Sequence, residues 1–193
     1  ISAVLHFAGL KAVGESVQQP LRYYQNNIGG MMTLLEELQK TDCRTLIFSS
    51  SATVYGTQHT APYAETVTPL SASNPYGETK IISEQLLQDL CQADSDWHIT
   101  ALRYFNPIGA HESGLLGEEP HGIPSNIAPY LALVASGQLP YFRVYGNDYD
   151  TPDGTGGRGT RFCPAIQHAA RWLLGIQLGN RQRLQCVGTG KYV

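Results

Sequence analysis

The heptapeptide TLIFSSS, residues 45–51, joins a short apolar run directly to three serines. An apolar run of this length that ends in polar residues is typical of a buried strand in a parallel sheet. Two other runs have the same form: AVLHFA at 3–8, which ends at Gly9, and ITALRYFN at 99–106. The sequence therefore predicts three buried strands.

Helical segments separate these runs. The first extends from Pro20 to about Lys40, and a proline suits a first helical turn because its missing N–H costs little there. The second extends from Pro75 to about Cys91, with Asn74 as its N-cap. Strands that alternate with helices predict right-handed βαβ units, and so an α/β fold with a Rossmann-like, doubly wound parallel sheet.

The ends of the predicted strands are the expected ligand site, because ligands of such sheets bind beyond the carboxyl ends of the strands. Segments 6–9, 49–51 and 105–107 all fall there. Beyond residue 107 the chain becomes rich in glycine, proline and acidic residues, which predicts a long loop. A helix at 126–137 and a strand at 141–146 are predicted to follow.

Composition narrows the class of protein. The 193 residues are 42% hydrophobic and 15% charged, with a net charge of −3 and no basic run, which disfavours nucleic-acid binding. We expect no transmembrane helix and no signal peptide. The four cysteines form no C-x-x-C pair, so we expect a reduced, cytoplasmic setting and no metal site.

Tyr76 and Lys80 carry the clearest chemical hypothesis. Their spacing of four residues places both on one face of a helix. An ammonium beside a phenol favours the phenolate and so lowers the pKa of the tyrosine, which could then exchange a proton with a substrate hydroxyl. Ser51, at a strand end, is placed to share that hydrogen bond. The alternative is a packed aromatic ring beside a solvated cation, because a Tyr-x-x-x-Lys spacing often occurs by chance.

Longer runs favour the catalytic interpretation. They are HFAGLKAVGES (6–16), FSSSATVYG (48–56), NPYGETK (74–80), LRYFNPIGAH (102–111) and VYGNDYDTPDGTG (144–156). Together they resemble the UDP-sugar 4-epimerases of the extended short-chain dehydrogenase/reductase family. The resemblance extends over residues 1 to about 158.

The resemblance implies a reaction and its catalytic residues. Members of this family interconvert UDP-galactose and UDP-glucose by oxidation and reduction at sugar C4, with NAD as the hydride carrier. By motif, Tyr76 would be the acid/base, Lys80 would lower its pKa and hold the nicotinamide ribose, and Ser51 would bridge the sugar hydroxyl and the tyrosine.

The same resemblance implies the binding residues. Cofactor-binding positions would be Phe7, Ala8, Gly9, Lys11, Asn26, Ser49, Ser50, Tyr76, Lys80 and Phe105. Substrate-binding positions would be Ser51, Thr53, Tyr76, Asn106, Asn126, Arg143, Val144, Tyr145 and Arg158.

Two departures from the family pattern concern the ends of the chain. We expect the glycine-rich turn that seats the cofactor's pyrophosphate to lie upstream of Ile1. Residues 159–186 do not follow the family, and VGTGKYV (187–193) resembles it again, which suggests a corrected reading-frame slip or an aberrant exon. We therefore divide the chain into a partial NAD-binding Rossmann domain (1–106), a partial UDP-sugar-binding region (107–158) and a divergent tail (159–193). We expect the isolated chain to fold weakly and to be inactive.

Three alternatives to an epimerase remain open. A sugar-nucleotide dehydratase or decarboxylase shares the Tyr-x-x-x-Lys pair, but usually has acids where this chain has Ala52. A non-catalytic sugar-nucleotide sensor and a fragment without function are the others. The resemblance also implies a homodimer built on the two predicted helices, whose leucine and isoleucine faces (34, 35, 38 and 81, 82, 86) could equally pack on the sheet.

Overall fold

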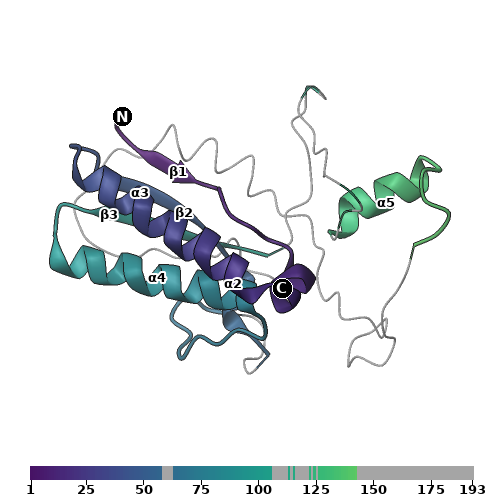
Figure 1. Ribbon diagram of the computed structural model, residues 1–193, viewed down its shortest axis with the longest axis horizontal. Coiled ribbons are helices and arrows are strands. Elements are labelled where there is room, and N and C mark those ends of the chain that lie inside the picture. The colour runs from purple at the N-terminus through teal and green to yellow at the C-terminus, as the bar shows by residue number, and fades with distance from the viewer. Residues whose placement is uncertain are drawn as a thin grey trace. The chain divides into compact units, whose positions relative to one another are not determined.

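A three-stranded parallel sheet organises the N-terminal part of the protein, as the computed structural model shows (Figure 1). The structure describes residues 1–57, 63–105, 113, 115, 122, 124 and 126–142. The strands are β1 (Val4–His6), β2 (Thr45–Ser51) and β3 (His98–Tyr104), in the order β1-β2-β3. All three predicted strands are present and their parallel pairing confirms the α/β class, but β1 is not buried as predicted, because it lies at the edge of the sheet.

The helices of this part precede and follow β2. Before β2 come α1 (Val13–Gln18), α2 (Pro20–Tyr23), the π-helical segment η1 (Tyr24–Gly29) and α3 (Gly30–Gln39). After β2 come the 3-10 turn η2 (Ala52–Tyr55) and α4 (Pro75–Ala93). The helix predicted from Pro20 is confirmed as α2, η1 and α3 in succession, but α1 and the π-helical segment were not predicted.

The register of the sheet brings the strand ends together. His6 of β1 lies opposite Phe48, and Ser50 and Ser51 of β2 lie opposite Arg103 and Tyr104 of β3. Because the strands are parallel, their carboxyl ends share one edge of the sheet. The predicted ligand-binding segments therefore do begin at a common edge.

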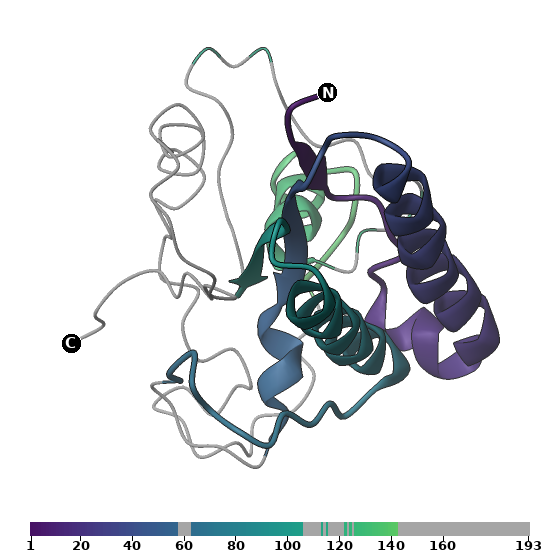
Figure 2. The same ribbon diagram turned by 90° about the vertical axis from the view of Figure 1, so that its left-hand side faces the viewer.

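One face of the sheet carries the hydrophobic core. Helices α3 and α4 run side by side over this face (Figures 1 and 2). The core consists of buried residues from both helices, from β2 and β3, and from the turns between them: Met31, Leu35, Leu38, Cys43, Leu46, Phe48, Leu87, Trp97, Ile99 and Ala101. Leu35 and Leu38, which the sequence left open between a dimer interface and the sheet, thus pack on the sheet.

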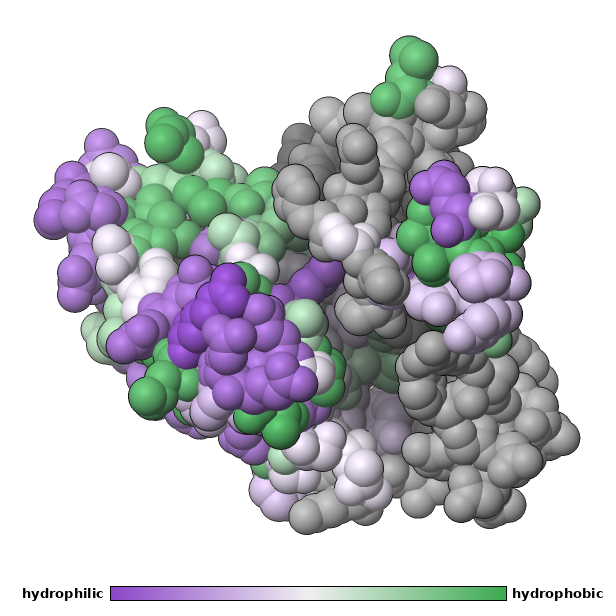
Figure 3. All heavy atoms as spheres, turned by 45° about the vertical axis from the view of Figure 1, so that its right-hand side comes forward, coloured by the Kyte–Doolittle hydropathy of each residue, from purple (hydrophilic) through white to green (hydrophobic). Residues whose placement is uncertain are grey.

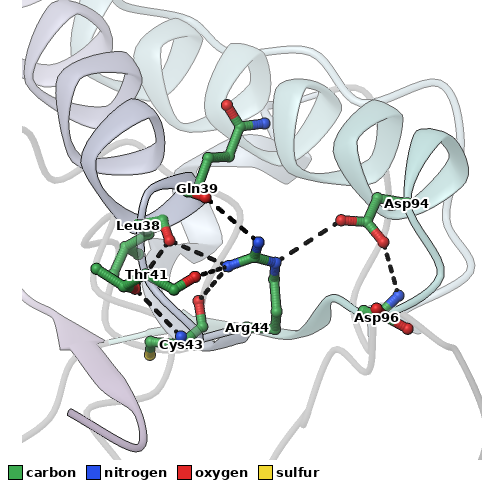
Figure 4. A network of polar contacts seen from close by, with 7 residues as sticks. All are labelled: Leu38, Gln39, Thr41, Cys43, Arg44, Asp94 and Asp96. Carbon is green, nitrogen blue, oxygen red and sulfur yellow. Dashed lines mark hydrogen bonds and ion pairs between the residues drawn. The ribbon is translucent and has the colours of Figure 1, made fainter.

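Arg44 joins the C-terminal ends of α3 and α4 (Figure 4). Its guanidinium donates to the carbonyls of Leu38 and Cys43 at 3.1 and 3.2 Å, lies 3.7 Å from the carboxylate of Asp94, and stacks 5.2 Å above the Trp97 ring. A cation at the C-terminal end of a helix interacts favourably with the last carbonyls and with the helix dipole. This network lies before β2, at the end of the sheet opposite to the predicted ligand site.

The edge strand β1 is the most open part of the sheet. Its Leu5 is 38% exposed, and apolar surface appears on the side of the molecule where β1 lies (Figure 3). Nothing pairs with its outer edge within the ranges that the structure covers.

A second compact unit begins after Phe105. Its helix α5 (Ile127–Ala135) confirms the helix predicted at 126–137, and Tyr130 packs edge-on against Phe142 at 5.6 Å between ring centroids. The strand predicted at 141–146 lies largely outside the described residues. No helix in the described ranges is long and apolar enough to cross a membrane.

Candidate active site

The N-terminus of α4 is fixed over the strand ends by local sequence. The Asn74 side chain accepts a hydrogen bond from the Gly77 N–H at 2.9 Å, and Pro75 occupies the first turn, so the predicted N-cap is confirmed. Gly77 lets this turn approach η2 closely. A Cβ there would lie 2.6 Å from that of Ala72 and 3.4 Å from that of Thr53.

Tyr76 lies at this junction, half-buried, with a side-chain hydrogen bond to Ser51. Burial raises the pKa of the Tyr76 phenol above its usual 10, and the hydrogen bond to Ser51 opposes that shift. The direction is opposite to the predicted lowering by Lys80. The physical reason is that burial disfavours the phenolate while the ammonium of Lys80 is turned toward another acceptor.

That acceptor is the backbone of β2. The Lys80 Nζ donates to the Ser49 carbonyl at 2.8 Å and lies over two aromatic rings, at 4.8 Å from the centroid of Phe48 and 5.7 Å from that of Tyr76. Burial lowers the pKa of Lys80 to about 8, and the negative charge of Glu84 opposes the shift. The ammonium is therefore the dominant form of Lys80 at neutral pH, and the neutral amine becomes dominant above a pH of about 8.

His6 completes the group of ionisable side chains at the sheet edge. It lies at the end of β1 and stacks on Phe48 with ring centroids 6.1 Å apart. Burial and the charge of Lys80 both lower the pKa of His6, which keeps the imidazole neutral at neutral pH. The Lys80 ammonium therefore lies beside an uncharged imidazole rather than beside a second cation.

The loop after β1 holds the predicted cofactor positions. Phe7 is 63% exposed, and Ala8, Gly9 and Lys11 are also exposed. Gly9 has a φ of +154°, and a Cβ there would lie 3.3 Å from the Asn27 Oδ1. The loop therefore presents its backbone outward while its inner side is held close to η1.

Asn27 is what holds the inner side of this loop. Its side chain accepts from the Leu10 N–H at 2.8 Å and donates to the Leu10 carbonyl at 3.0 Å. It also donates to the Thr79 hydroxyl on α4 at 3.1 Å. Sequence analysis selected the neighbouring Asn26, which is exposed and donates to Asn27 at 2.9 Å. Asn27 thus connects the loop, the π-helical segment and α4, and π-helical turns occur often at functional sites.

Three other predicted residues lie in or next to the elements that follow β1: Ser50 in β2, Thr53 in η2 and Phe105 directly after β3. The Thr53 hydroxyl is buried without a hydrogen-bond partner among the described residues. Phe105 is 50% exposed and stacks with Tyr55 and Tyr63, at 6.2 and 6.1 Å between centroids. The hydroxyl of Ser50, predicted to bind the cofactor, is buried and donates to Glu84.

The remaining predicted residues belong to the second part of the chain. Asn126 is exposed and precedes α5, without a side-chain cap bond. The structure does not describe the others: Asn106, Arg143, Val144, Tyr145 and Arg158. In the ranges that it does describe, no cluster of metal-ligating side chains occurs.

Glu84 and Arg103 were not predicted, although the sequence pattern contained a sign of both. Glu84 follows Lys80 by four residues, so it shares the helix face of Tyr76 and Lys80. Alternation along β2 and β3 places Ser50 and Arg103 on the same face as the core residues Phe48 and Ala101. A charged residue at a core position of a strand predicts a buried ion pair.

A parallel α/β sheet with a serine, a tyrosine and a lysine gathered at its strand ends defines a Rossmann-like protein. The chain belongs to the NAD dependent epimerase/dehydratase family, whose sequence profile matches residues 1–158.

Curated relatives narrow the similarity further. The chain is 58% identical over 195 residues to the UDP-glucose 4-epimerase of Dictyostelium discoideum, an alignment that covers 99% of this chain and 56% of the relative. It is 57% identical over 158 residues to that of Bacillus subtilis, covering 82% of this chain and 46% of the relative. The chain therefore spans about half the length of these relatives.

Solved structures agree with the fold. The UDP-glucose 4-epimerase of Bifidobacterium longum in complex with NAD+ and UDP is 57% identical, with a TM-score of 0.77 over 81% of this chain and 47% of that one. The enzyme of Stenotrophomonas maltophila with bound NAD and formylated UDP-arabinopyranose is 56% identical, with a TM-score of 0.76 over 81% and 46%.

Proposed function

We propose that this chain carries the acid–base half of a UDP-glucose 4-epimerase site, which interconverts UDP-galactose and UDP-glucose. The observation that carries the proposal is the arrangement at the end of β2, where Ser51 hydrogen-bonds to Tyr76 and the Ser49 carbonyl holds Lys80. The family assignment and the identity to named epimerases support the same activity.

The residues present fit a nicotinamide cofactor. The exposed backbone of 7–9 and the donors of Tyr76 and Lys80 lie at the carboxyl edge of a parallel sheet, where such cofactors bind. NAD, when bound, would supply hydride exchange at sugar C4. In this proposal Lys80 and Tyr76 hold its nicotinamide ribose, and Phe7 to Lys11, Asn26 and Phe105 line its site.

Tyr76 moves the proton that accompanies that exchange. As phenolate it accepts the proton of the C4 hydroxyl, and as phenol it returns one, so one residue serves as general base and then as general acid. Ser51 hydrogen-bonds to the phenol oxygen and orients the hydroxyl. Lys80 must supply the positive charge that favours the phenolate, because burial alone opposes it.

A chimera provides the decisive test. Residues 1–158 of this chain would replace the matching residues of the Bacillus subtilis relative, and conversion of UDP-galactose to UDP-glucose would be followed with NAD present. We expect turnover, and we expect its loss in the Tyr76→Phe chimera. An inert chimera beside an active parent enzyme would contradict the proposal, and a 4-keto-6-deoxy sugar product would assign a dehydratase instead.

Substrate and cofactor binding by the 193-residue chain should be measured in parallel. Saturation-transfer NMR with UDP-galactose and with NAD tests binding without requiring turnover. Binding without turnover in either the chain or the chimera would favour the non-catalytic sensor. The predicted substrate residues Thr53, Asn106, Asn126, Arg143, Val144, Tyr145 and Arg158 belong to this proposal.

We also propose a cellular location and an oligomeric state. We propose a cytoplasmic protein, because Cys43 and Cys91 are both free thiols. A homodimer through α3 and α4 is supported by Met32 and Ile82, which leave apolar surface exposed at 45% and 39%. Sedimentation equilibrium of the chain and of a Met32→Glu variant would test the dimer.

A further inference from the structure

The core face of the sheet changes from apolar to charged at its carboxyl end. Along β2 the residues on this face are Leu46, Phe48 and then Ser50, and along β3 they are Ile99, Ala101 and then Arg103. Ser50 and Arg103 are opposite each other in the register. The last layer of the core, nearest to the site, is therefore polar.

Glu84 of α4 closes this layer. Arg103 donates to one oxygen of the Glu84 carboxylate at 3.0 Å through Nε and to the other at 2.7 Å through Nη2. The side chains are 6% and 5% exposed. The Ser50 hydroxyl donates to the first of these oxygens, and Arg103 also donates to the Tyr55 hydroxyl at 3.1 Å. This ion pair thus touches β2, β3, α4 and η2 at once.

Stability alone is a weak explanation for such a pair. Burying two charges costs hydration, and apolar side chains of similar volume often serve a core as well or better. Geometry offers a second role. Three successive residues of β2 contact three residues spaced four apart on one face of α4: Ser51 with Tyr76, Ser49 with Lys80, and Ser50 with Glu84.

We propose that Glu84 and Arg103 are a positioning pair for the Tyr76–Lys80 site, in which Arg103 fixes Glu84 and Glu84 holds the Ser49–Ser51 end of β2 against α4. The inference rests on the proposed function only in naming that site catalytic. Neither residue of the pair reaches the open strand ends, so both act through the residues that do.

The pair also sets the charge beside Lys80. The groups that face Lys80 in the described structure are His6 on β1, Tyr76 and Glu84 on α4, and Arg103 on β3 through its ion pair with Glu84. The negative charge of Glu84 supports the ammonium against burial. If Glu84 were neutral, Lys80 would lose this support and Arg103 would lose the carboxylate with which it forms its buried ion pair.

Two titrations of the 193-residue chain test the inference, and neither requires cofactor, substrate or turnover. In protein labelled with ¹³Cε-lysine, Glu84→Gln should move the titration midpoint of Lys80 below that of the unchanged chain, because the charge that opposes the effect of burial on the Lys80 pKa is removed. Glu78→Gln is the matched control, because Glu78 lies on the same helix but bonds to the Ala72 N–H, and it should leave the midpoint in place. An unmoved Lys80 midpoint in folded Glu84→Gln overturns the proposal.

The second variant is milder and serves if Glu84→Gln fails to fold. Ser50→Ala removes the contact between strand and carboxylate but keeps the ion pair. It should loosen the hydrogen bond between Ser51 and Tyr76, and therefore raise the midpoint of Tyr76 in ¹³Cζ-tyrosine spectra. A Tyr76 midpoint equal to that of the unchanged chain contradicts the positioning role.

The outcomes separate this inference from the proposed function. Moved midpoints with an inert chimera would support the pair and reject the epimerase. An active chimera with unmoved midpoints would support the epimerase and leave Glu84 and Arg103 as parts of the core only. In an active chimera, Glu84→Gln should also shift the alkaline limb of the pH profile to lower pH, and Glu84→Asp should restore it in part because it keeps the charge.

Discussion

Helices α3 and α4 cover the same face of the same sheet, but they bury different kinds of residue. The buried side chains of α3 are Met31, Leu35 and Leu38. Those of α4 include Thr79, Lys80, Ser83 and Glu84, and Leu87 is the one apolar member of its buried set. A helix that buries so much polar surface gives up hydrophobic stabilisation. The difference indicates that α3 mainly stabilises the fold, whereas α4 gives up some stability to position the residues of the proposed site.

The largest expected effect comes from the acid–base residue of α4. Tyr76→Phe keeps the packed ring but removes the proton carrier, so turnover of the chimera should fall by roughly 10²–10⁴-fold. The midpoint of urea unfolding should change little. Tyr24→Phe, on η1, is the control and should leave turnover unchanged. A comparable loss in both variants would show that the effect is not chemical.

Next is the buried ion pair. Arg103→Met leaves the Glu84 charge buried and unpaired, which should lower the free energy of unfolding by about 3–5 kcal/mol. The double variant Glu84→Leu/Arg103→Met should recover most of that loss but not the position of the strand end. Urea unfolding measures the recovery. A double variant as unstable as the single one would mean that the packing cannot accept apolar residues there.

The corresponding change in α3 should affect stability alone. Leu35→Ala opens a cavity in the core and should lower the free energy of unfolding by about 2–5 kcal/mol. The Lys80 titration midpoint should stay where it is, because Leu35 is apolar and carries neither a charge nor a hydrogen-bonding group that could act on the ammonium. A shifted Lys80 midpoint would show that α3 influences the site as well as stability.

The pH dependence of stability should distinguish the helices as well. Lys80 titrates at about 8 when folded and at its usual 10.5 when unfolded, so above pH 8 the unfolded chain holds more protons. The free energy of unfolding should therefore rise between pH 8 and 9, by at most about 1.4 kcal/mol per pH unit. Lys80→Met should remove this rise, and Lys40→Met on the solvent side of α3 should retain it. An equal slope in all three proteins would assign the titration to another group.

The smallest effect is expected at the N-cap of α4. Asn74→Ala removes the bond to the Gly77 N–H and should cost roughly 0.5–2 kcal/mol of stability. Because this cap fixes the turn that carries Tyr76, turnover of the chimera should fall together with stability. Asn74→Asp keeps an acceptor at the same place and should restore both quantities.

Local sequence patterns were enough to predict the strands and the start of α4. The apolar runs that end in polar residues predicted the three strands, and Asn74-Pro75 predicted the start of α4, because caps and strand ends depend on nearby residues. The π-helical segment was not predictable in this way. It places Asn27 toward both Leu10 and Thr79, and those contacts exist only after the chain has folded.

The residues of the candidate site were also predicted only in part. Motifs selected Tyr76, Lys80 and Ser51, which the structure brings together, but they implied a lowered pKa for Tyr76. The opposite direction follows from the depth of the phenol and from the turn of the Lys80 ammonium toward Ser49, neither of which is written in the spacing of the two residues. Glu84 and Arg103 were missed because their pairing depends on the register of β2 against β3.

The contacts of the three serines have a consequence for how this segment can change in length. A strand alternates its faces at every residue, whereas α4 presents the same face every four residues. Inserting one residue before Phe48 would turn Phe48 out of the core, but it would leave serines at both positions that now hold Ser50 and Ser51, and any residue supplies the carbonyl that Lys80 needs. Such an insertion should therefore cost stability before it disturbs the contacts with α4, because the run of three serines keeps a hydroxyl opposite Glu84.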